Sequence, residues 1–157
     1  MGSLSELYQS LILDHNRSPR NFRSMENADC HAEGYNPLCG DQLSVWVKLD
    51  DDRIEDISFQ GSGCAISRAS ASLMTTAVKG RTVAEAREIF DRFHRMITGQ
   101  ADSTSEKVPA KLAVFAGVAE FPSRVKCAGL SWHALKSALD RGPEKVSTDD
   151  EPDVRQR

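Results

Sequence analysis

The segment from Gln42 to Leu49 constrains the fold most, because aliphatic side chains occupy every second position along it. Such alternation puts the aliphatic side chains on one face of an extended chain, which is typical of a strand with one buried face. Three aspartates, Asp50–Asp52, separate this segment from a second apolar stretch, Ile54–Phe59. The two stretches predict a hairpin whose apolar face must be covered by another layer.

Helical periodicity lies on both sides of this hairpin. Thr82 and Glu85 have the spacing of a capping box, and Ser123 is a candidate cap for the last helix. His15 ends the first helix, where a cation is favourable. A shorter apolar run covers Leu112–Val118. The segments that we expect to be helical are Leu4–His15, Ala65–Lys79, Thr82–Ile97 and Ser123–Arg141.

This order of elements predicts an α+β fold. We expect a small antiparallel sheet of about three strands, the third near Cys30–Glu33, packed against about five helices. A chain of 157 residues with 39% hydrophobic content suits one core. We expect residues 1–141 to form this domain and 142–157, which are polar, to be a disordered tail.

Composition excludes several classes of function. The formal net charge is -3 and no basic face is evident, so we expect no nucleic-acid partner. No apolar run approaches the roughly 20 residues that span a bilayer. Met1–Tyr8 lacks the basic start and apolar centre of a signal peptide, so we expect a cytoplasmic protein with no membrane contact. In that reducing compartment, cysteines are more often ligands or reactive thiols than disulfides.

Three of the four cysteines have distinctive surroundings. Cys39 lies in a turn, flanked by proline and glycine, just before a strand. Cys64 follows Gly61–Gly63 at a strand-to-helix junction, where a helix N-terminus favours the thiolate. Cys127 comes early in the last helix, behind cationic side chains. Their long spacings exclude a C-x-x-C zinc knuckle, so from spacing alone a shared site and three ordinary buried cysteines both remain open.

The local sequences around these cysteines carry a resemblance. The motifs are Leu7–Asn21 (LYQSLILDHNRSPRN), Asn36–Asp41 (NPLCGD), Gly61–Ser67 (GSGCAIS) and Phe121–Trp132 (FPSRVKCAGLSW). Together they resemble the iron–sulfur scaffold family of IscU and the N-terminal part of NifU, over about residues 4–140. Lys126 stands where IscU-type scaffolds carry a histidine, and Gln100–Glu120 holds a longer stretch, so the chain is most similar to the zinc-containing SufU branch.

The resemblance implies a site and its metal. One zinc ion would be bound by Cys39, Asp41, Cys64 and Cys127, with an accessory role for Arg124. Three thiolates and a carboxylate are acceptable tetrahedral zinc ligands, and the same thiolates suit a transient iron–sulfur cluster. Cys30 matches no motif of the family, and we interpret it as a spectator thiol.

The resemblance also implies a function and partners. Cys39 would accept persulfide sulfur from a SufS-like cysteine desulfurase, a pyridoxal phosphate enzyme, and pass it to a downstream iron–sulfur scaffold or apo-protein. One alternative is a scaffold on which an iron–sulfur cluster is assembled and passed on. Another is a zinc-stabilised adaptor domain without sulfur chemistry. An independent redox thiol enzyme is disfavoured, because no resolving C-x-x-C pair is present.

Overall fold

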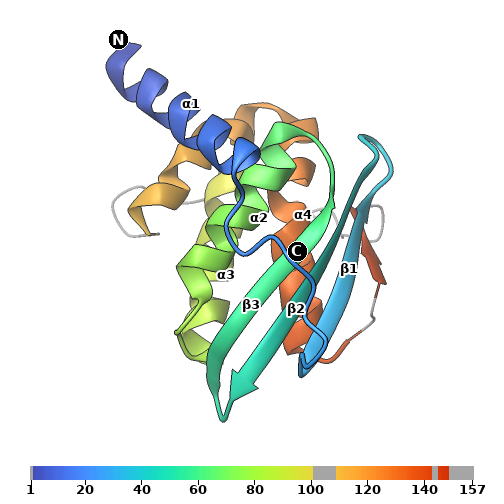
Figure 1. The fold of residues 1–157 in the computed structure, drawn as a ribbon. Coiled ribbons are helices and arrows are strands. Elements are labelled where there is room, and N and C mark those ends of the chain that lie inside the picture. The colour runs from blue at the N-terminus through green and yellow to red at the C-terminus, as the bar shows by residue number, and fades with distance from the viewer. Residues whose placement is uncertain (1, 101–108, 143–144, 149–157) are drawn as a thin grey trace.

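The computed structural model describes residues 2–100, 109–142 and 145–148, and it is drawn in Figure 1. It confirms the α+β class, with five helices and a four-stranded sheet. The elements are α1 (Gly2–Arg17), β1 (Cys30–Asn36), β2 (Asp41–Asp50), β3 (Arg53–Ser62), α2 (Ala65–Val78), α3 (Val83–Ile97), the 3₁₀ helix η1 (Ala110–Glu120), α4 (Pro122–Leu139) and β4 (Lys145–Ser147).

The hairpin that the sequence predicts is β2 and β3, which pair antiparallel with Val45 opposite Phe59 and Val47 opposite Ile57. β1 pairs antiparallel with the other side of β2, and β4 pairs parallel with β1, giving the order β3-β2-β1-β4. The sheet is therefore mixed and has one strand more than we expected.

The additional strand lies in the segment 142–157, which we expected to be a disordered tail. Lys145–Ser147 instead form β4, Val146 packs against the core, and Thr148 is buried. A strand this short shows no alternation in the sequence, so only its pairing with β1 defines it. Residues 149–157 lie outside the described part of the chain.

The helices gather on one side of the sheet, and α4 runs behind β1 and β2 (Figure 1). Aliphatic and aromatic side chains of β2 and β3 point into this layer and are fully buried. The same face of β2 begins with Asp41, two residues before Leu43, because side chains alternate along a strand. The alternation along β2 therefore places the Asp41 carboxylate in the protein interior, at the first residue of the strand.

Two expectations about helix ends need correction. α4 begins at Pro122, and Ser123 lies inside it instead of capping it, since proline at the first helical position already has the required φ. α1 continues to Arg17, so His15 is not at a solvated end: it is 3% exposed, and its Nδ1 lies 2.7 Å from Ser72 Oγ. The capping box of Thr82 is confirmed, with both of its hydrogen bonds present.

Within the described ranges, no helix combines the length and apolar character needed to cross a membrane.

Candidate metal centre

The turn between β1 and β2 presents Cys39. Asn36 ends β1 and pairs directly with Asp41 at the start of β2, so the four residues between them form a tight connection. Gly40 adopts a φ of +75°, which favours glycine, and its N–H donates to the Asn36 carbonyl at 2.8 Å. Leu38 and Cys39 are exposed, and Leu38 retains 63% of its accessible surface. The fold therefore holds one thiol at the surface beside a buried carboxylate.

The carboxylate of Asp41 is fully buried and held from two sides. Its Oδ2 accepts a hydrogen bond from Asn36 Nδ2 at 3.0 Å, and its Oδ1 accepts one from the Cys64 backbone N–H at 2.9 Å. Gly63 packs against it so closely that a Cβ at that residue would lie 2.7 Å from Oδ1. Asp41 is thus oriented by two donors and enclosed on a third side.

Cys64 reaches the same end of the sheet because the last residue of β3, Ser62, pairs with Gln42 at the start of β2. It is the N-cap of α2, and its Sγ accepts a hydrogen bond from the Ser67 N–H at 3.4 Å. A hydrogen bond from the Cys127 thiol, and further ones from helix N–H groups, lower the pKa of Cys64 to about 6, although burial opposes them. The N–H groups at the start of α2 act in the direction expected of this junction, but the Cys127 thiol makes the larger contribution.

Cys127 enters from α4 and is 4% exposed. Its Sγ lies 3.6 Å from Cys39 Sγ and 3.7 Å from Asn36 Nδ2. The hydrogen bond to Cys64, followed by burial, raises the pKa of the Cys127 thiol. The contact between the two thiols therefore favours ionisation of Cys64 over ionisation of Cys127.

Three of the four predicted ligands lie together. One ligand atom each from Cys39, Asp41 and Cys127 falls within 4.8 Å of the others. Two sulfurs that bind one tetrahedral zinc at about 2.3 Å lie about 3.8 Å apart, which fits the distance between these two thiols. The sulfur of Cys64 lies outside this group, although the Cys64 backbone N–H donates to Asp41 Oδ1 at 2.9 Å. The four-ligand set itself stays a prediction.

The other residues singled out in the sequence lie elsewhere. The guanidinium of Arg124 stacks over the Phe121 ring at 4.6 Å from its centroid, on the surface, and its accessory role stays a prediction. Cys30 is buried in the hydrophobic core, and burial raises the pKa of its thiol, as suits a spectator. Sequence reasoning assigned no role to Asn36 or Thr148, which contact each other beside the candidate ligands. Buried positions alternate along β1, and the last of them is Asn36. An asparagine at a buried strand position is the signal that could have identified it.

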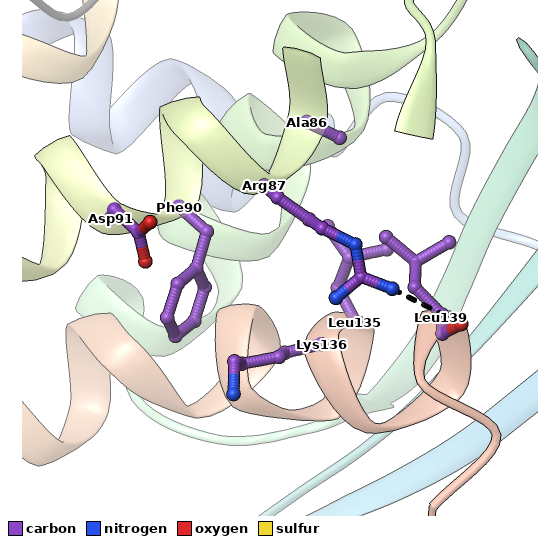
Figure 2. Close-up of a pocket in the computed structure, with 7 residues that line it drawn as sticks. All are labelled: Ala86, Arg87, Phe90, Asp91, Leu135, Lys136 and Leu139. Carbon is purple, nitrogen blue, oxygen red and sulfur yellow. Dashed lines mark hydrogen bonds between the residues drawn. The ribbon is translucent and has the colours of Figure 1, made fainter. Parts of the chain in front are cut away.

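A separate hollow of about 170 Å³ lies between α3 and the C-terminal half of α4 (Figure 2). Phe90 and Leu135 give it an apolar wall, and Arg87 reaches across to the Leu139 carbonyl at 3.5 Å. Cys127 is on the N-terminal half of α4, so this hollow is not part of the metal centre.

Comparison with known proteins places these residues in a family. The model of the NifU-like N terminal domain matches residues 7–128, a span that contains all four predicted ligands. The chain belongs to this family. It is 41% identical over 141 residues to the iron–sulfur cluster assembly scaffold protein IscU of Streptococcus pyogenes serotype M1, covering 90% of this chain and 87% of that one.

The zinc-dependent sulfurtransferase SufU of Bacillus subtilis (strain 168) is 39% identical over 137 residues, covering 87% of this chain and 92% of the relative. A crystal structure from Fervidobacterium islandicum AW-1, described as a candidate iron–sulfur scaffold for the SUF system, matches with a TM-score of 0.78 and 35% identity, covering 85% of this chain and 97% of the other. This member of the NifU N-terminal family therefore has the IscU/SufU fold and belongs to a family of iron–sulfur cluster assembly proteins.

Proposed function

We propose that this chain is a zinc-containing sulfur acceptor that takes persulfide sulfur from a SufS-like cysteine desulfurase. The observation that carries the proposal is the pairing of an exposed thiol, Cys39, with a buried thiol and a buried carboxylate at one end of the sheet. A zinc-dependent sulfurtransferase among its relatives supports it.

The donor set fits zinc. Cys39, Asp41 and Cys127 supply two sulfurs and an oxygen already grouped within 4.8 Å, and Cys64 would complete the set from the start of α2. Bound zinc would keep the thiols deprotonated at neutral pH and tie three distant segments together. The chain contributes the rest: two N–H donors orient the carboxylate, and the helix start favours the thiolate of Cys64.

Cys39 is the proposed acceptor. Its thiolate would attack the outer sulfur of the desulfurase persulfide, so that a new S–S bond forms on Cys39. The old S–S bond breaks, and the desulfurase cysteine leaves as a thiolate. Cys127 is 4% exposed and lies within a helix, whereas Cys39 is exposed on a turn with a left-handed glycine next to it. Cys64 is exposed as well, but it is the N-cap of α2, so we assign the acceptor role to the thiol on the turn. The sulfur would pass on to a downstream iron–sulfur scaffold or apo-protein.

A second candidate is a scaffold that builds an iron–sulfur cluster on the same ligands. The 41% identity to a protein named as an IscU scaffold favours it. Thiolate ligands of this kind serve iron–sulfur clusters as well as zinc. The two functions differ in what the protein carries: a metal-bound thiol that turns over sulfur, or a coloured cluster that is handed on.

The test combines metal analysis with a desulfurase assay. We expect stoichiometric zinc in the purified protein, and sulfide release by a cysteine desulfurase that rises when the protein is added. Cys39→Ala should abolish this activation, and Cys30→Ala, the matched control, should keep it. A visible cluster that transfers to an apo-protein would favour the scaffold. Zinc without any effect on the desulfurase would indicate an adaptor domain.

A further inference from the structure

Asn36 lies between two candidate ligands that come from different elements. It is the last residue of β1 and is fully buried. Its Nδ2 donates to Asp41 Oδ2 at 3.0 Å and lies 3.7 Å from Cys127 Sγ. One side-chain amide thus connects the carboxylate at the start of β2 with the thiol in α4.

The orientation of this amide follows from the groups that face its two ends. A carboxylate and a thiolate only accept hydrogen bonds, so the amide nitrogen, and not the oxygen, must face them. The oxygen then points the opposite way, and there Thr148 Oγ1 donates to Asn36 Oδ1 at 3.1 Å. Thr148 is 5% exposed, so water does not readily replace its hydroxyl. The carboxylate therefore sets the amide orientation in which Asn36 is a donor to the centre, and the threonine hydroxyl provides a buried hydrogen-bond donor for the amide oxygen.

The sheet brings these two residues together across 112 positions of the sequence. β4 pairs parallel with β1, with Gly34 opposite Val146 and Tyr35 opposite Ser147. One step further along this register places the residue after β4 beside the residue that ends β1. The C-terminal strand is in this way attached to the end of the sheet where the candidate ligands lie.

We propose that Asn36 is a positioning residue of the metal centre, and that Thr148 makes the C-terminal strand part of that centre by holding the oxygen of the Asn36 amide in place. The proposal rests on the proposed zinc site. Residues that hold metal ligands in place by hydrogen bonds typically change metal affinity by about 10–100-fold when they are replaced. Asn36 holds two ligands, so its removal should fall in this range.

The experiment uses two shape-preserving variants in the full-length chain. Asn36→Asp keeps the side-chain shape but replaces the NH₂ donor with an oxygen that faces Asp41. Thr148→Val replaces the hydroxyl with a methyl group of similar size. Zinc affinity is measured by competition with a chromophoric chelator, and Co²⁺ binding by its thiolate charge-transfer and d–d absorption bands, which report ligand geometry and not stability. We expect Asn36→Asp to weaken zinc binding about 10–100-fold, Thr148→Val to weaken it less, and both to change the cobalt spectrum.

Two controls carry the same chemical changes elsewhere. Asn27→Asp adds an equal charge at an exposed turn, and Thr76→Val removes a hydroxyl that bonds the Leu73 carbonyl at 2.8 Å within α2. Both should bind zinc as the parent does. Circular dichroism of the metal-free proteins identifies any variant that does not fold. If Asn36→Asp does not fold, the zinc affinity and cobalt spectrum of Thr148→Val test the positioning role.

Zinc affinity and cobalt spectra equal to those of the controls, in folded variants, would overturn the positioning role and leave the zinc site intact. A parent protein that binds neither metal would instead overturn the zinc site, and this inference with it.

Discussion

Replacing Gly63 with alanine should disturb the centre although no candidate ligand is replaced. A Cβ at Gly63 would lie 2.7 Å from Asp41 Oδ1, 3.1 Å from its Cγ and 3.2 Å from its Cβ. These contacts are too close, so either the backbone or the carboxylate must move. The carboxylate is bonded to the Asn36 amide at 3.0 Å and to the Cys64 N–H at 2.9 Å, so it moves only by losing a bond.

The expected decrease in the free energy of unfolding follows from these contacts. If the backbone shifts to make room for the Cβ, the protein loses about 1–3 kcal/mol of stability, as is typical of overpacking. If the Asp41 carboxylate moves instead, the protein loses one hydrogen bond to a charged group, which contributes about 1.5–3 kcal/mol. The φ of Gly63 is outside the left-handed region, so alanine adds no backbone strain and stabilises by about 0.4–1 kcal/mol through the unfolded chain. We expect a net decrease of about 1–2 kcal/mol in the free energy of unfolding.

Urea denaturation of the metal-free protein measures this decrease, and chelator competition measures the accompanying loss of zinc. Gly117→Ala is the matched control, because a Cβ at that exposed residue would meet nothing within 4 Å. We expect it to be neutral or slightly stabilising. If Gly63→Ala were as stable as Gly117→Ala and held zinc equally well, the account of a tightly held Asp41 carboxylate would be wrong.

Three further predictions concern ligands and pH. Asp41→Cys should complete a four-thiolate site, hold zinc more tightly in chelator competition and transfer less sulfur; unchanged transfer would refute a special role for the carboxylate. Cys64→Ala or Cys127→Ala should release zinc by elemental analysis and cost several kcal/mol in unfolding experiments, because structural zinc binding is folding energy; full zinc in Cys64→Ala would remove that residue from the site. Burial lowers the pKa of His15, so the unfolded chain binds a proton more readily than the folded one, and stability should fall as pH drops below about 6.5. The urea midpoint should therefore be lower at pH 5.5 than at pH 7.5, and His15→Gln should reduce this difference.

The elements with strong periodicity were predictable. The alternation along β2 sets which of its side chains are buried, so the register with β3 and the core of the sheet follow from it. The N-cap position of Cys64 was also predictable, because glycines and a change of period mark a strand-to-helix junction. These features depend on residues close together in the sequence.

What escaped prediction depends on pairing between distant segments. β4 has three residues and is a strand because it pairs with β1, and His15 is buried because α1 packs on α2, where Ser72 contacts it. Asn36 was part of a recognised motif, but its role becomes visible only when Thr148 is placed beside it. The three-dimensional grouping of Cys39 with Cys127 likewise needs α4 to pack on the sheet.

The most direct test of the central claim is to locate the transferred sulfur. The protein is incubated with a cysteine desulfurase and cysteine, the persulfides are trapped by alkylation without reduction, and the peptides are analysed by mass spectrometry. The account predicts one additional sulfur on the peptide that contains Cys39, and its loss in Cys39→Ala. Additional sulfur on Cys64, Cys127 or Cys30 in place of Cys39 would contradict it.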